Sequence, residues 1–147
     1  MSEDGFIDDS FGDINTISLE AIREVFYEEA LVESAEFNEI TNPRKLTIEF
    51  SDGVTSLGTL TVRWSIRGYY SFHYSEGDMQ FRFDHHDNPH SPKKHFHPPP
   101  SASTEGAEES CIEVEVDELV ARAVLKLWRR WYESDGEIDS NKGEDPP

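Results

Sequence analysis

Apolar residues recur at helical spacing near the start of the chain. Between residues 19 and 26 the apolar side chains fall on one face and the charged ones on the other, which is typical of an amphipathic helix. Ser18 directly precedes this run and carries a hydroxyl of the kind that caps helix N-termini. We therefore predict a helix that begins near Ser18 and ends near Ala30. Its apolar positions are Leu19, Ile22, Val25 and Phe26.

From residue 34 to residue 83 the apolar period changes to two. Apolar and polar residues alternate over about five short runs, which are separated by turn-forming sequences such as Asn42-Pro43 and Glu76-Gly77-Asp78. Such alternation is typical of strands that bury one face and leave the other polar. This part of the chain predicts an antiparallel meander of about five strands.

A second amphipathic run lies near the C-terminus, where Asp117 is placed to cap a helix. The apolar face of this run predicts a helix that packs on one face of the sheet. Its members are Val120, Ala123, Val124, Leu127 and Trp131. The opposite face carries a basic stripe, Arg122, Lys126, Arg129 and Arg130. Residues 111–116 fit one further short strand. The predicted fold class is α+β: an N-terminal helix, an antiparallel β-meander of about five strands, and a C-terminal helix packed on one face of the sheet.

Composition divides the chain into three parts. Residues 1–16 carry five acids, and residues 134–147 are acidic with Gly and Pro, so we expect two disordered tails. Residues 17–133 form a single α+β domain. Within it, residues 85–100 are expected to be a His/Pro-rich loop, because five prolines between residues 89 and 100 disfavour a helix and a central strand.

The chain is strongly acidic, with 31 Asp and Glu residues against 13 Lys and Arg residues and a formal net charge of −18. Such a charge opposes the compact state and the binding of nucleic acid, unless salt screens it. Because the acids are spread over the whole chain, the composition resembles that of halophilic, haloarchaeal cytoplasmic proteins; an acidic mesophilic protein is the alternative. Cys111 is the single cysteine, and the sequence has neither a signal peptide nor a long apolar run. We therefore expect a cytoplasmic protein that does not bind membranes.

Five of the six histidines lie within thirteen residues, directly after the last predicted strand of the meander. Imidazole can transfer a proton or bind a metal near neutral pH, so this clustering indicates a functional site. Arg82 and Asp84 share one face at the end of that strand. The histidines are His85, His86, His90, His95 and His97.

One interpretation of this segment is acid–base cleavage of RNA, which needs no metal cofactor. Two imidazoles would act as base and acid, while Arg82 holds the phosphate and Asp84 orients one imidazole. The candidate catalytic residues are Arg82, Asp84, His90, His95 and His97, and the candidate substrate-binding residues are Lys93 and Lys94.

Two other interpretations stay open. The segment could bind a divalent metal such as zinc, in a metalloenzyme or in a non-enzymatic metal- or partner-binding module. The candidate ligands are then Asp84, His85, His86, His90, His95 and His97. In the third interpretation, the histidines belong to a solvated loop, where they cap turns and stack on Phe96 and the prolines.

Three short sequences within residues 81–97 resemble the TumE-type toxin family of prokaryotic toxin–antitoxin modules. They are Phe81-Arg82-Phe83-Asp84, Asn88-Pro89-His90 and Lys94-His95-Phe96-His97. The order of elements is also similar over roughly residues 17–132. The resemblance implies a toxin with a cognate antitoxin protein as its partner, and it is compatible with RNA as the target.

Overall fold

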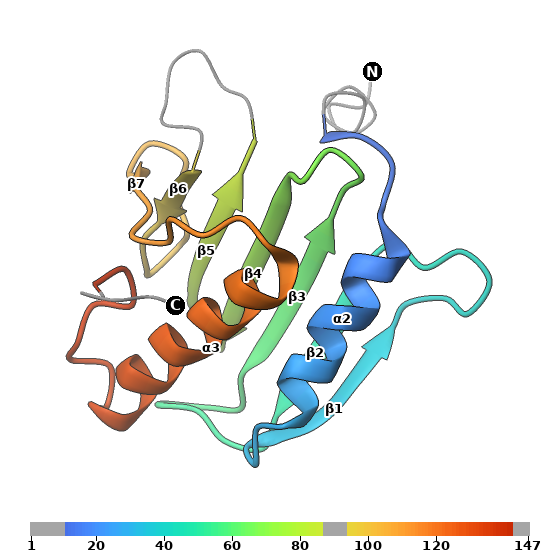
Figure 1. The fold of residues 1–147 in the computed structure, drawn as a ribbon. Coiled ribbons are helices and arrows are strands. Elements are labelled where there is room, and N and C mark those ends of the chain that lie inside the picture. The colour runs from blue at the N-terminus through green and yellow to red at the C-terminus, as the bar shows by residue number, and fades with distance from the viewer. Residues whose placement is uncertain (1–10, 87–93, 143–147) are drawn as a thin grey trace.

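The computed structural model describes residues 11–86 and 94–142 and has two helices beside one antiparallel sheet (Figure 1). The sheet has seven strands in sequence order, each paired antiparallel with the next. The elements are α2 (Thr16–Tyr27), β1 (Val32–Phe37), β2 (Leu46–Phe50), β3 (Thr59–Trp64), β4 (Tyr70–Glu76), β5 (Met79–His85), β6 (Lys94–His97), β7 (Glu108–Glu109) and α3 (Asp117–Glu133). The predicted α+β class is confirmed, whereas five strands was an undercount.

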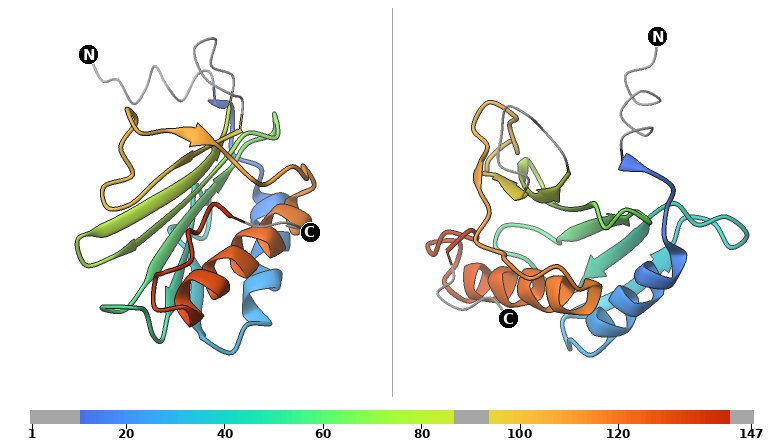
Figure 2. Two further views of the ribbon diagram at one scale, coloured as in Figure 1. Left: turned by 90° about the vertical axis from the view of Figure 1, so that its left-hand side faces the viewer. Right: turned by 45° about the horizontal axis from the view of Figure 1, so that its top comes forward.

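Both helices cover the same face of the sheet, and the opposite face carries no helix in the described part of the chain (Figure 2). The predicted apolar positions of both helices are buried. They pack on alternate residues of the strands, of which Phe72, Phe81 and Phe83 are at most 1% exposed. Period-two alternation therefore assigned the two faces of the strands correctly.

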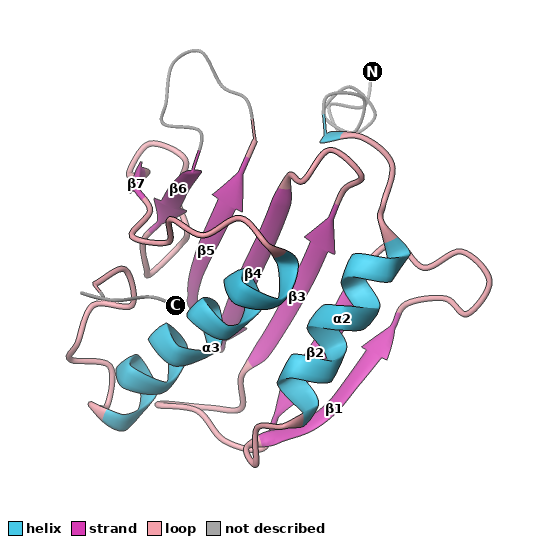
Figure 3. Ribbon diagram, in the orientation of Figure 1, coloured by secondary structure: helices cyan, strands magenta, loops and turns pink. Residues whose placement is uncertain are grey.

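The two helices, drawn in cyan in Figure 3, begin at other residues than predicted. Asn15 caps α2, and its Oδ1 accepts a hydrogen bond from the backbone N–H of Ser18 at 3.1 Å. Ser18 is thus the residue whose N–H is capped, and the helix ends at Tyr27 rather than near Ala30. In α3 the cap position is Val116, and Asp117 is the first helical residue, where its charge favours the positive end of the helix dipole.

The predicted loop 85–100 contains a strand, β6, which pairs with β5 on one side and with β7 on the other. This strand contains no proline and is followed directly by Pro98. Phe96 anchors it in the core, with its ring centroid 4.8 Å from that of Phe83. The final strand of the sheet is β7 and not residues 111–116. The segment 87–93 lies outside the described residues.

Parts of both predicted tails pack on the domain. Residues 11–15 lie along the end of β3, where the N–H of Asn15 donates to the carbonyl of Trp64 at 2.8 Å. At the other end, Asn141 is buried and accepts a hydrogen bond from the N–H of Cys111 at 2.8 Å. Residues 1–10 and 143–147 lie outside the described part of the chain. In that described part, neither helix has the length and apolar character needed to cross a bilayer.

Candidate functional site

The candidate site lies on the helix-free face, where β5 and β6 run side by side. Phe83 of β5 and Phe96 of β6 point into the core, so their neighbours in sequence point to the opposite face. The register places Asp84 opposite His95, and Arg82 opposite His97. Strand pairing thus brings one carboxylate, one guanidinium and two imidazoles into a single group, which we call the Asp84 cluster: Arg82, Asp84, His95 and His97.

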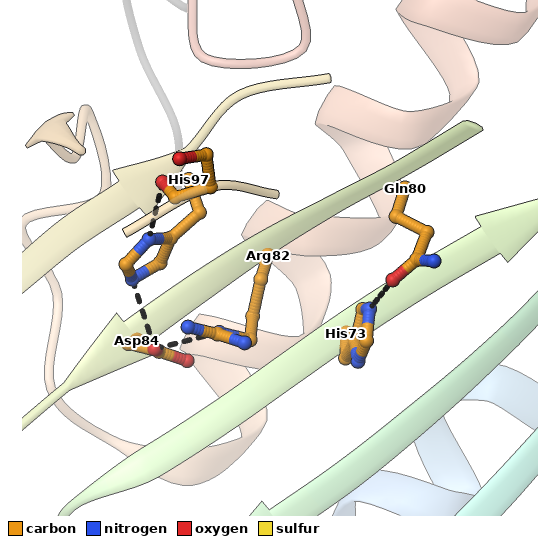
Figure 4. Close-up of polar contacts among 6 residues, drawn as sticks. His73, Gln80, Arg82, Asp84 and His97 are labelled. Carbon is orange, nitrogen blue, oxygen red and sulfur yellow. Dashed lines mark hydrogen bonds and ion pairs between the residues drawn. The ribbon is translucent and has the colours of Figure 1, made fainter. Parts of the chain in front are cut away.

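A chain of polar contacts runs through this cluster (Figure 4). Arg82 Nε donates a hydrogen bond to Asp84 Oδ2 at 2.8 Å. His97 Nε2 lies 3.2 Å from the same oxygen, and His97 Nδ1 lies 3.1 Å from the carbonyl oxygen of Ser103. A carbonyl can only accept, so Nδ1 of His97 carries a hydrogen. A hydrogen bond therefore fixes Nδ1 of His97, while Nε2 lies against the carboxylate without a hydrogen bond of regular geometry.

Three members of the cluster are almost fully buried, because Asp84, His95 and His97 are 6%, 3% and 2% exposed. Burial by itself raises the pKa of the Asp84 carboxyl. Burial is the largest single influence, but the contacts with His97, the charge of Arg82 and the contact with Ser71 on the neighbouring strand together lower the pKa by more. The net pKa lies below its usual value, so Asp84 is a buried carboxylate near neutral pH.

The character of the contact between His97 and Asp84 depends on whether Nε2 of the ring carries a hydrogen. With its hydrogen on Nδ1, a neutral His97 ring turns a lone pair at Nε2 toward the carboxylate. The contact becomes a hydrogen bond when Nε2 also carries a hydrogen. Within the described residues, the other oxygen of Asp84, Oδ1, is buried and makes no hydrogen bond of regular geometry.

The cluster has the geometry of a possible metal site. One ligand atom from each of Asp84, His95 and His97 lies within 4.8 Å of the others. Imidazole nitrogen and carboxylate oxygen are common zinc ligands. A ligating histidine usually donates its second N–H to a carbonyl or a carboxylate, as His97 does to Ser103. The residues present therefore fit a divalent metal, which would supply Lewis-acid chemistry if bound.

The family model described as Toxin TumE matches residues 19–132, which include the whole Asp84 cluster. The chain belongs to the TumE toxin family. No curated protein and no solved structure matched in the other two comparisons. For a TumE-family toxin, the expected protein partner is an antitoxin.

Two candidate residues of this TumE-family protein lie on the other side of the sheet. His85 packs edge-on against the ring of Tyr70, a core residue, with centroids 5.4 Å apart. Burial lowers the pKa of His85, the charge of Lys94 lowers it further, and Glu115 opposes this. Lys94 Nζ is 3.2 Å from the Glu115 carboxylate. Neither residue therefore joins the Asp84 cluster.

Of the remaining candidate residues, one lies near the cluster and two lie outside the part of the chain that the structure describes. The His86 ring stacks edge-on against His95, with centroids 4.7 Å apart, at the margin of the cluster. His90 and Lys93 lie outside the described residues.

Sequence reasoning missed two contributors to this face. Ser103 holds His97 through its backbone carbonyl, which no side-chain pattern could indicate. His73 of β4 stands opposite Arg82, and its Nε2 is 2.7 Å from Gln80 Oε1 (Figure 4). Alternation along β4 puts His73 on the face opposite to Phe72, but only the register shows that His73 neighbours Arg82.

Proposed function

We propose that this protein is the toxin of a toxin–antitoxin module and that it cleaves RNA by acid–base chemistry at the Asp84 cluster. The observation that supports this proposal is the chain of contacts from Arg82 through Asp84 to His97, on the face that no helix of the described chain covers. Family membership supports the toxin role and the antitoxin partner.

The proposed reaction is the transesterification of a phosphodiester. A base removes the proton of the 2′-hydroxyl, whose oxygen attacks phosphorus. The bond from phosphorus to the 5′-oxygen then breaks, and an acid donates a proton to that oxygen. The products are a 2′,3′-cyclic phosphate and a 5′-hydroxyl. In the cluster, Arg82 stabilises the charge that develops on the phosphate, and its side chain is 27% exposed for this role.

The two buried imidazoles supply the proton transfers. We assign His97 as the acid, a role in which its Nε2–H turns from the Asp84 carboxylate, 3.2 Å away, to the substrate oxygen. His95 is the base, and its ring centroid is 5.0 Å from that of His97. His90 and Lys93 stay candidates for a third imidazole and a phosphate contact.

A metal-binding function is the second candidate. It is favoured by the grouping of Asp84, His95 and His97 and by the hydrogen bond that fixes the ring of His97. In that case the protein would bind a divalent metal such as zinc, either as a metalloenzyme or as a non-enzymatic module. In this second candidate Asp84, His95 and His97 would hold the metal, whereas in the first they handle protons.

Cleavage of purified RNA tests the first candidate. We expect the wild-type protein, purified without a histidine tag and assayed over a range of salt concentrations, to generate 2′,3′-cyclic phosphate ends. His95→Ala and His97→Ala should each cleave at least roughly 100-fold more slowly, because one acid or base contributes about 10²–10⁴ to a rate. His85→Ala is the matched control and should stay within a few-fold of wild type, because His85 lies on the other face.

Equal cleavage by all four proteins would exclude acid–base catalysis at this site. Elemental analysis of the same preparations separates the two candidates. The metal-binding candidate would be favoured if the wild type contains stoichiometric zinc, His97→Ala contains none, and a chelator abolishes cleavage. Full cleavage by a metal-free protein would favour proton transfer.

A further inference from the structure

We propose that a pocket beside the β1–β2 loop binds a phosphate group of the RNA, away from the group that is cleaved. The inference rests on the proposed function for its choice of RNA as the ligand. It adds a second point of attachment, the cation pocket, which is defined by Arg44, Lys45 and Arg63.

The cation pocket is lined by positive side chains and has a volume of about 280 Å³, which is small for a ligand pocket. Its other lining residues are Phe11, Gly12, Ile14 and Asn38. Among these described lining residues three are cations and none is a carboxylate, although the chain has 31 acids against 13 bases. An anion is therefore the ligand that this pocket fits best.

Hydrogen bonds order the backbone that carries Arg44 and Lys45, and an aromatic ring packs against the side chain of Arg63. Asn38 Oδ1 accepts hydrogen bonds from the backbone N–H groups of Arg44 at 2.9 Å and Lys45 at 3.0 Å. The N–H of Asn38 in turn donates to the carbonyl of Lys45, so the loop is closed on itself. The guanidinium of Arg63 lies 4.6 Å from the ring centroid of Phe11. The ordered backbone at Arg44 and Lys45 and the packed side chain of Arg63 reduce the entropic cost of binding a ligand.

Strand pairing connects the cation pocket to the Asp84 cluster. Arg63 of β3 pairs with Ser71 of β4, and Ser71 pairs with Asp84 of β5. Directly paired residues point to the same face of a sheet, and neighbouring strands are about 4.8 Å apart. The backbone positions of Arg63 and Asp84 are therefore roughly 10 Å apart on the helix-free face. A short single strand of RNA that crosses β4 could contact both.

The surface between the two sites suits a polyanion. None of the outward positions of β3 and β4, all of which are described, is a carboxylate. They are Thr59, Thr61, Arg63, Ser71, His73 and Ser75. An RNA strand that lies across these outward residues would contact hydroxyl, imidazole and guanidinium groups, which bind phosphates and sugars.

The basic stripe of α3 is a weaker candidate for an RNA-binding surface, because ion pairs with acidic residues neutralise part of its charge. Arg122 pairs with Glu28 of α2 at 3.5 Å. Arg129 pairs with Glu29 and, at 3.2 Å, with Glu133. The stripe belongs to α3, which covers one face of the sheet (Figure 2), whereas the Asp84 cluster lies on the opposite face.

Binding of a 2′-O-methyl oligouridine tests the inference without cleavage, because the blocked 2′-oxygen cannot attack. We would measure fluorescence anisotropy over a series of KCl concentrations. The double variant Arg44→Gln/Lys45→Gln should weaken binding on the order of tenfold and reduce the salt slope by about 0.7 for each phosphate that the pocket no longer neutralises. Arg122→Gln/Lys126→Gln removes the same charge from α3 and should change the affinity less than about threefold. Circular dichroism would show that both variants fold.

Three results would overturn the inference. The two double variants could weaken binding equally, the pocket variant could leave binding unchanged, or the wild type could fail to bind RNA. Unchanged RNA binding by the pocket variant with loss of antitoxin binding would assign the pocket to a protein interface instead. If RNA binds through the pocket but no RNA is cleaved, the proposed function fails and the phosphate site stands. If cleavable RNA is cut with the same KM by wild type and the pocket variant, the phosphate site fails and the proposed function stands.

Discussion

One carboxylate oxygen organises the candidate site. Asp84 Oδ2 receives the hydrogen bond of Arg82 and lies against His97, while the side chain is largely buried. A buried carboxylate is stable only when charged donors compensate for its missing hydration. Arg82 and His97 therefore position Asp84 as much as Asp84 positions them, and the three residues should behave as one unit.

A double-mutant cycle measures this coupling. Arg82→Met should destabilise the protein by about 1–3 kcal/mol, because the buried carboxylate of Asp84 loses a charged donor. In an Asp84→Asn background the same change should cost much less. The measurement is urea unfolding of the four proteins. Arg122→Met, which removes an exposed pair with Glu28, is the control and should cost less than about 1 kcal/mol. Additive effects of Arg82→Met and Asp84→Asn would contradict the coupling.

A second buried carboxylate, Glu76, shows what residue patterns miss. Its sequence context, Glu76-Gly77-Asp78, indicated only a turn. In the structure Glu76 is 2% exposed and accepts hydrogen bonds from the backbone N–H of Thr55 and the hydroxyl of Tyr74, each at 2.6 Å. Thr55 comes from a different loop, so no local pattern could predict this arrangement.

At the scale of elements, β6 decides whether the site exists. This strand is only Lys94–His97, yet it carries two imidazoles of the Asp84 cluster. Its stability comes from Phe96, which is fully buried against Phe81 and Phe83. A strand of this length has few other apolar contacts, so it depends on this one anchor.

Removal of the anchor should therefore damage both stability and activity. We expect Phe96→Ala to destabilise the protein by about 3–5 kcal/mol, the usual cost of a large cavity in a core. Toxicity or RNA cleavage should fall with it, because His95 and His97 lose their alignment. Thermal and urea unfolding measure the first effect. Ile40→Ala, at a side chain that is 97% exposed, should change stability by less than about 0.5 kcal/mol. A small effect of Phe96→Ala would show that β6 is not anchored by its aromatic residue.

At the scale of the molecule, charge is the dominant property. A net charge of −18 on a single domain produces strong self-repulsion at low ionic strength. The acids are spread over the chain, while the outward positions of β3 and β4 carry none. A polyanion that approached the helix-free face along these two strands would therefore meet no carboxylate at their outward positions.

Stability should rise with salt if the halophilic interpretation of the composition is correct. The Debye length falls from about 10 Å at 0.1 M to about 3 Å at 1 M salt, which removes most of the repulsion between acids. We expect the Tm to increase continuously over this range of KCl, with circular dichroism as the measurement. The same series in NaCl controls for a specific effect of potassium. A Tm that stays constant or decreases would favour the mesophilic alternative.

The sequence by itself determined the fold class, the apolar faces of both helices, and the two faces of the strands. It also placed Arg82 and Asp84 on the same face of a strand end. These features follow from spacing along the chain, because periods of 3.6 and 2 are local properties of helices and strands.

Only the tertiary structure decided which residues meet. Prolines on both sides of Lys94–His97 indicated a loop, whereas burial of Phe96 made this segment a strand. The β5–β6 register then placed His95 and His97 against Asp84 and Arg82, and left His85 and Lys94 on the other side. Register depends on pairing between distant segments and on core packing, so it cannot be obtained from local spacing.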